Sequence, residues 1–209
     1  VPDWLTPIAW VFIGLALATA VVIAVDIYVR RHRHTTVAAE LVWITSALYL
    51  GPFALAAYAR WGRADVATGQ QPTVVAGLPG GGASAVAHLI GVPLVIASGL
   101  TIAGINLWVM ILVIGVLAMV MLFAYERTAH RRGGGLSAGT ALMAAVVTVL
   151  AFDIGMGGWM LLLHFNEYMP PATEASFWFL MQVGIVLGLA TGYPAVQWLL
   201  RRRQTALPA

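Results

Sequence analysis

Residues 85–125 form an almost uninterrupted apolar run, and this run constrains the fold more than any other feature of the chain. As one α-helix it would be about 60 Å long, whereas a bilayer core is about 30 Å thick and takes about 20 residues to cross. The run must therefore fold back on itself. We expect the turn at Ala-Gly-Ile-Asn, residues 103–106, because Gly and Asn tolerate tight-turn geometry.

The composition indicates the same class of protein. Of the 209 residues, 61% are apolar and 9% are charged, and the mean hydropathy is +0.89. A soluble domain carries about 25% charged residues, so this chain cannot cover a water-facing surface. No hydrophilic block is long enough for a soluble domain, and we expect a single transmembrane domain over residues 1–209. Its main partner is the lipid bilayer.

We expect an all-α integral membrane bundle of six transmembrane helices. The expected spans are residues 5–29, 37–58, 85–103, 106–125, 136–163 and 175–199, with a long polar connection at 60–84. The first run lacks a basic segment before it and is too long for a signal-peptide core, so it is expected to be retained. The alternative is five spans plus a re-entrant segment at 85–103, because Gly91 and Pro93 would suit a broken helix.

Arginines near the span ends predict the orientation. Six spans place both termini on one side, with eight arginines there and three on the other, which favours cytoplasmic termini in a bacterial inner membrane. The five-span alternative divides the arginines nine to two and places the N-terminus outside. The net charge of +3 reflects these clusters, so we expect no nucleic-acid partner.

The absence of two residue types excludes several functions. The chain has no cysteine, which excludes disulfides, thiolate metal sites, iron–sulfur clusters and thiol redox catalysis. All eleven basic residues are arginine, so no lysine can form a retinal Schiff base. We find no nucleophile and base with a distinctive spacing, and we do not expect an enzyme.

One expected span carries a polar stripe. Asp153, Met156, Met160 and His164 are spaced so that a helix places them on one face. Thioether and imidazole groups suit Cu(I), and a carboxylate in mid-membrane is costly. These four residues, with His88 near the start of the third span, are the candidate metal ligands. The alternative is core packing by the methionines and a hydrogen bond from Asp153 to a neighbouring helix.

Two further patterns concern packing. Gly184, Gly188 and Gly192 form a doubled GxxxG pattern, which permits close helix contact within the chain or in a homo-oligomer. Asp26 and Arg30 are four residues apart, so an ion pair is expected.

In the six-span bundle, His88 and His164 would lie on opposite faces of the membrane and could not bind one haem.

Several strings support a resemblance that reaches from the second span to the last. They are YLGPFALAAYARWGR, AHLIGVPLVIASGLTIAG, FDIGMGGWM, FWFLMQVG and TGYPAVQWLL. They resemble a bacterial family of small polytopic membrane proteins catalogued only as a domain of unknown function, some of whose relatives are loosely labelled copper-related. The family pattern has a histidine followed by two cysteines. His88 matches the histidine, but Leu89 and Pro93 stand where thiols are expected.

Three functional hypotheses follow. The first is a non-catalytic subunit or assembly factor of a larger membrane complex. The second is handling or permeation of a metal ion, with copper as the cofactor, along Asp153, Met156, Met160 and His164. The third is a membrane enzyme that binds haem or quinone. The resemblance supports the fold and implies no activity.

Overall fold

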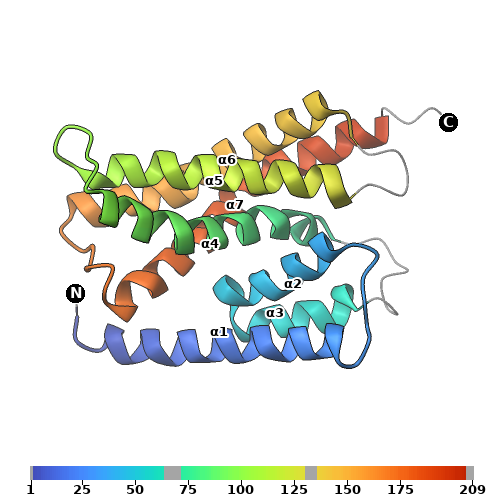
Figure 1. Ribbon diagram of the computed structural model, residues 1–209, viewed down its shortest axis with the longest axis horizontal. Helices are drawn as coiled ribbons and strands as arrows, with labels where there is room; N and C mark the ends of the chain where they lie inside the picture. Colours follow the sequence, from blue (N-terminus) through green and yellow to red (C-terminus); the bar gives the residue numbers. More distant parts are fainter. Residues whose placement is uncertain (1, 64–71, 130–135, 206–209) are drawn as a thin grey trace.

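The computed structural model describes residues 2–63, 72–129 and 136–205, which form a bundle of helices (Figure 1). The helices are α1 (Leu5–Tyr28), α2 (Val37–Leu50), α3 (Pro52–Ala57), a π-helical turn η1 (Tyr58–Gly62), α4 (Thr73–Ser98), α5 (Asn106–Ala129), α6 (Ala138–Phe165) and α7 (Ala175–Thr205). Hydroxyl side chains cap two of the starts, since Thr36 accepts from the amide of Ala39 and Ser137 from that of Thr140.

Five of these helices are long and apolar enough to cross a bilayer, namely α1, α4, α5, α6 and α7. The described residues therefore form a helical bundle of the membrane-embedded type. The expected span at 37–58, the second along the chain, is not a single helix. It is broken at Gly51, which has a φ of +56° and is followed by Pro52. The expectation of six spans is thus not confirmed.

The broken segment folds back as a hairpin of α2 with α3 and η1, residues 37–62 (Figure 1). Both of its ends lie beside the C-terminal end of α1, because Glu40 pairs with Arg33 and Arg63 pairs with Asp26. Its tip reaches back along α1, where a Cβ on Gly51 would lie 3.1 Å from the Phe12 ring. Among the described residues, this hairpin is the segment that enters the bundle and turns back to the end from which it came.

Residues 85–103 are therefore not re-entrant, because α4 runs without interruption to Ser98. The turn to α5 lies where it is expected, with positive φ at Gly99, Ala103 and Gly104. The expected connection at 60–84 is partly wrong, since α4 already begins at Thr73. Its glycines serve packing: a Cβ on Gly81 would lie 2.7 Å from the Tyr49 ring, so the hairpin packs directly on the α4 backbone.

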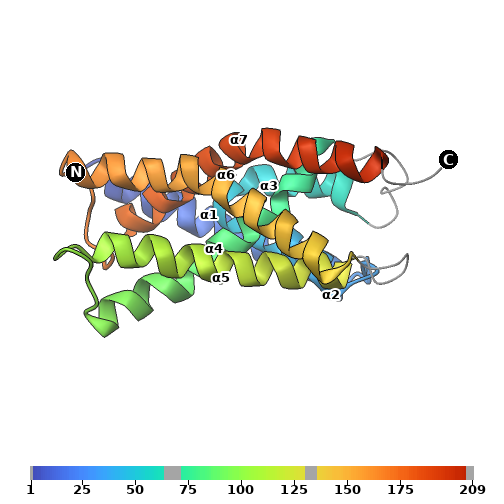
Figure 2. The same cartoon turned by 90° about the horizontal axis from the view of Figure 1, so that it is seen from above.

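α6 lies between α5 and α7 (Figure 2). The three spaced glycines of α7 face α6. A Cβ on Gly184 would meet the sulfur of Met156, and one on Gly188 would lie 2.6 Å from the Phe152 ring. In return, a Cβ on Gly155 of α6 would lie 2.5 Å from the backbone oxygen of Leu187. The two backbones approach closely because neither helix has a side chain at these positions.

Charge is distributed unevenly between the two ends of the bundle. α1 begins and α7 ends at opposite ends, so the termini do not lie on one side as expected (Figure 1). The arginines that the structure describes all lie at the end where α1, α5 and α7 finish, which we call the arginine end: Arg30, Arg31, Arg33, Arg60, Arg63, Arg127, Arg201, Arg202 and Arg203. The described residues of the other end include Asp3, Glu167 and Glu174 but no arginine.

Candidate ligand-binding cavities

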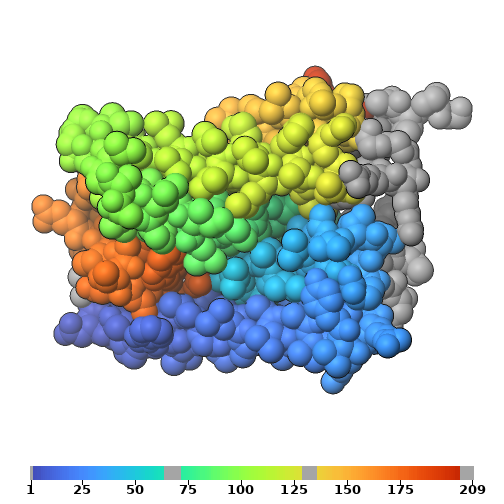
Figure 3. All heavy atoms as spheres, viewed as in Figure 1, coloured from blue at the N-terminus to red at the C-terminus, as the bar shows by residue number. Residues whose placement is uncertain are grey.

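The main candidate site is a cavity that exists because the hairpin is shorter than α1. Beyond the hairpin tip, the N-terminal half of α1 packs on α7, which in turn packs on α4, as the blue, orange and green surfaces in Figure 3 show. A cavity of about 360 Å³ lies between them. We call it the His88 cavity. It is lined by Trp10, Ile13, Ala16, Leu17, Leu48, Ala85, His88, Leu89, Thr173, Glu174, Ala175, Trp178, Met181, Gln182 and Ile185.

His88 supplies the most informative polar atom of this cavity. His88 is only 3% exposed, and its Nδ1 lies 2.8 Å from the carbonyl oxygen of Ser84. Because a carbonyl oxygen can only accept, Nδ1 of the neutral imidazole carries the hydrogen and donates it. Nε2 is then a bare acceptor. It is buried and has no hydrogen-bond partner among the described residues.

Gln182 brings a second orphaned acceptor to the same cavity. Its Oε1 is also buried without a partner among the residues that the structure describes. Buried polar atoms are nearly always hydrogen-bonded, since leaving one unpaired costs about 1–3 kcal/mol. Two residues from different helices, α4 and α7, that carry such atoms line one cavity, which makes it a candidate site for another molecule.

The walls of the His88 cavity are mainly apolar, and its rim faces the outside of the bundle. Trp10, Leu17 and Leu89 are 63%, 54% and 52% exposed, and all three belong to candidate membrane spans. Thr173 and Glu174 lie at the other part of the rim, in the loop before α7. The rim of the cavity thus includes exposed residues of the helix sides as well as of the loop at the end of the bundle.

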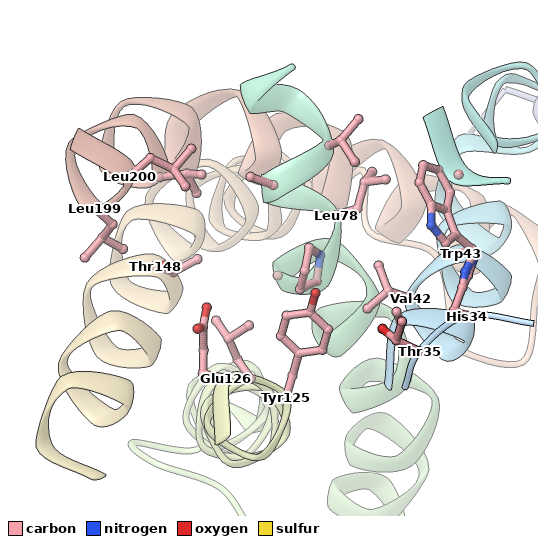
Figure 4. Close-up of a pocket in the computed structure, with 18 of the residues that line it drawn as sticks. His34, Thr35, Val42, Trp43, Leu78, Tyr125, Glu126, Thr148, Leu199 and Leu200 are labelled. Carbon is pink, nitrogen blue, oxygen red and sulfur yellow. The ribbon is translucent and has the colours of Figure 1, made fainter. Parts of the chain in front are cut away.

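A second cavity of about 450 Å³ lies at the arginine end, between the hairpin and α4 to α7. Figure 4 shows Tyr125 and Glu126 extending into it from α5, with Thr148 on α6 and His34 across the space. Arg33 in its wall is held by Glu40 through bonds of 2.6 and 3.1 Å. Burial lowers the pKa of His34, which favours its neutral form. The cation of this wall is thus already paired within the chain.

The α6 stripe is divided between two neighbours. The sulfur of Met156 faces Gly184 of α7, whereas the carboxylate of Asp153 faces Gly115 of α5. Met160 is 2% exposed in the core, and the ring of half-buried His164 packs on Phe165 at 5.4 Å. The described residues contain no group of three or more His, Asp or Glu side chains that could hold a metal ion. The metal site stays a prediction.

His88 belongs to the separate cavity between α1, α4 and α7. That cavity extends to Glu174, in the connection that follows α6, so His88 and His164 lie towards the same end of the bundle. Their expected separation across the membrane placed His88 near the start of a span at 85–103, and it is wrong because α4 already begins at Thr73, so that His88 lies in the second half of this helix.

Two functional residues were missed from the sequence. Gln182 is one of two amides within the apolar run 175–199, the other being Gln197, and this was the available signal. Arg63 is the principal partner of Asp26, donating bonds of 3.1 and 2.8 Å to its two oxygens. The expected pair of Asp26 with Arg30 exists but is longer, at 3.6 Å. The carboxylate also accepts from the Tyr58 hydroxyl at 3.0 Å.

Comparison with known proteins gives one finding. Residues 71–204, more than half of the chain, match the family model for a domain of unknown function, DUF4396. The matched segment includes α4 to α7, with His88, Asp153 and Gln182. No curated protein and no solved structure matches. The chain therefore belongs to the DUF4396 family, as its strings between the second and last spans suggest.

Proposed function

We propose that this protein is a membrane-embedded binding protein for a lipid-soluble molecule that carries a hydrogen-bond donor. The observation that carries the proposal is that His88 and Gln182, each with a buried acceptor that has no partner among the described residues, line one cavity of about 360 Å³. A molecule that donates to these atoms would remove the cost of leaving them unpaired.

The cavity walls support an apolar body for this molecule. Trp10 and Trp178 offer flat aromatic surfaces, and Leu17 and Leu89 at the rim face the bilayer. A hydroxylated aromatic ring, such as a phenol or hydroquinone headgroup, has both features. Entry from the bilayer would also concentrate such a ligand beside the site.

The orientation of the site follows from the charge distribution. We propose that the arginine end is cytoplasmic, because arginines flanking spans are retained on that side. The C-terminus would then be cytoplasmic, the N-terminus would lie outside, and the His88 cavity would open in the outer half of the bilayer. All nine described arginines lie at one end of the bundle, which is a stronger bias than the division of eight to three expected from six spans.

The test compares two probes, one with a hydroxyl group and one in which a methyl group replaces the hydroxyl hydrogen. 1-Naphthol and 1-methoxynaphthalene share a ring system, but only naphthol donates a hydrogen bond. One hydrogen bond contributes about 1 kcal/mol, so naphthol should bind about five-fold more tightly. Thermal unfolding of the purified protein in detergent measures both affinities, because a ligand of the native state raises the melting temperature.

The variant His88→Phe keeps a ring and removes one acceptor, and Gln182→Leu removes the other, so the double variant should abolish the preference for naphthol. His164→Phe is the matched control, since His164 is half-buried on α6 and does not line the cavity. It should keep the preference. Equal affinities of the two probes for the parent protein, or a preference that survives the double variant of His88→Phe and Gln182→Leu, would refute the proposal.

A subunit of a larger membrane complex is a second candidate, and one observation favours it: Asp153 lacks a partner among the described side chains.

Metal handling by the α6 stripe has no comparable support. Metal analysis of the purified protein would test it. Stoichiometric copper that is lost in Met160→Leu would support a copper site, and a metal-free protein would leave Met156 and Met160 as core residues.

A further inference from the structure

Asp153 differs from the other charged residues of the spans in its position. It lies near the middle of α6, and its Oδ2 is 3.2 Å from where a Cβ on Gly115 would be. Gly115 is itself near the middle of α5. The carboxyl group therefore occupies space at the α5–α6 contact that any larger residue at position 115 would take.

The carboxyl group has no partner in the part of the chain that the structure describes. Neither oxygen takes part in a hydrogen bond or ion pair with a described residue, whereas Asp26 is bonded by Arg63 and Tyr58. A carboxyl group at this depth is costly when it is left unpaired, and residues of this kind commonly pair with another helix or line a functional path.

The surroundings of Asp153 show where a partner could come from. Asp153 is itself half-buried, and the residues beside it on both helices point outward: Leu112 and Val116 on α5 are 59% and 60% exposed, and Leu150 and Ile154 on α6 are 59% and 72% exposed. We call these four residues, with Gly115 and Asp153, the Asp153 face. A partner must therefore approach from the lipid side.

We propose that the Asp153 face is the contact surface of a two-fold homodimer in which Asp153 of each copy hydrogen-bonds to Asp153 of the other. Copies inserted in the same direction place identical residues at the same depth, so the two carboxyl groups can meet across the axis. When one is protonated it donates to the other, as in carboxyl pairs that share a proton. Because Gly115 has no side chain, α5 of one copy can approach the other copy closely.

A second copy suits this face better than a basic partner from within the chain. The described arginines all lie at the arginine end, away from the middle of the spans. A carboxyl group is both donor and acceptor when protonated, so the face is complementary to itself, which an isologous interface requires.

Cysteine crosslinking can test the contact without background, because the chain has no cysteine. Val116→Cys lies on the Asp153 face, and Val21→Cys on α1 is the matched control, with exposures of 60% and 62% for the two valines. Oxidation in membranes should crosslink two copies through position 116 and not through position 21. Similar yields at both positions would overturn the proposal.

The role of the carboxyl group is tested in the Val116→Cys background. Asp153→Leu should lower the crosslinking yield about ten-fold, equivalent to about 1.4 kcal/mol of association. Asp153→Asn should preserve it, because two amides can pair as two carboxyl groups do. A yield unaffected by Asp153→Leu, or a crosslink to a different protein, would contradict the homodimer. If Asp153→Leu does not fold, the comparison of positions 116 and 21 still decides.

Discussion

α1 borders two regions of different character. Its C-terminal half packs against the hairpin, where Asp26 accepts hydrogen bonds from Arg63 and Tyr58 and where Glu40 is held by Arg33. Its N-terminal half borders the His88 cavity, where His88 Nε2 and Gln182 Oε1 have no partner among the described residues.

The difference shows how the chain treats buried polar groups. Beside the hairpin the carboxylates of Asp26 and Glu40 are paired within the protein and hold the hairpin in place, although His32 Nδ1 and His34 Nε2 there have no hydrogen-bond partner among the described residues. Beyond the hairpin tip the space is left open and its acceptors are unpaired. We infer that the first region serves the structure and the second serves a ligand, so substitutions should cost stability in the first and alter binding in the second.

The largest effect is expected at the base of the hairpin. Arg63→Met removes the two bonds to Asp26, whose side chain is 8% exposed, and breaking a buried ion pair costs about 3 kcal/mol or more. Thermal unfolding in detergent measures the loss. Arg30→Met is the control: this arginine is 69% exposed and 3.6 Å from the same carboxylate, so its loss should cost about 1 kcal/mol or less. Equal losses would mean that Arg63 does not anchor the hairpin.

The sequence predicts the helices of the second half of the chain well. α5 was expected at 106–125 and is Asn106–Ala129, and α6 was expected at 136–163 and is Ala138–Phe165. In these segments the length of the apolar run determines the helix, because a bilayer crossing requires about 20 residues. The turn at 103–106 was predictable for the same reason.

The hairpin was not predictable from hydropathy. Residues 37–58 are as apolar as a full span, and Gly-Pro is tolerated within membrane helices. What returns the chain to its starting side is the contact of Arg63 with Asp26, which are far apart in sequence. Gly81 and Gly82 fall in the polar connection expected at 60–84, whereas close packing on the hairpin requires them, since a Cβ on either would meet Tyr49 or Thr45 of α2.

The candidate site was only partly predictable. His88 was selected as a polar residue in an apolar run, but the choice of its free nitrogen depends on the Ser84 carbonyl at 2.8 Å. Gln182 becomes relevant only when α7 is placed beside α4. The fold, through the short hairpin, creates the cavity that joins them.

A smaller effect is expected where α4 meets the hairpin. Gly81→Ala places a methyl group 2.7 Å from the buried Tyr49 ring, and such overpacking costs about 1–3 kcal/mol. Gly77→Ala on the same helix is the control, since its nearest neighbour, Leu189, would be 3.6 Å away. It should be neutral or stabilising because alanine favours helix. If both variants unfold at the same temperature, the hairpin does not pack tightly on α4.

The smallest effect on stability is expected in the cavity itself. Ala85→Val extends into the open space, so it should cost less than about 1 kcal/mol, yet it should weaken binding of 1-naphthol. Ala87→Val makes the same change at a residue that is 0% exposed and does not line the cavity. It should cost more stability. The reverse order in thermal unfolding would show that the cavity is not open space.

The central claim is that His88 presents a free Nε2 to a donor ligand, and ¹⁵N NMR of histidine-labelled protein tests it most directly. The His88 signals are identified as those lost in His88→Phe. We expect Nδ1 to be protonated and Nε2 to be unprotonated. Addition of 1-naphthol should shift the Nε2 signal, whereas addition of 1-methoxynaphthalene should leave it unchanged. A protonated Nε2, or an Nε2 signal that responds equally to both compounds, would contradict this claim.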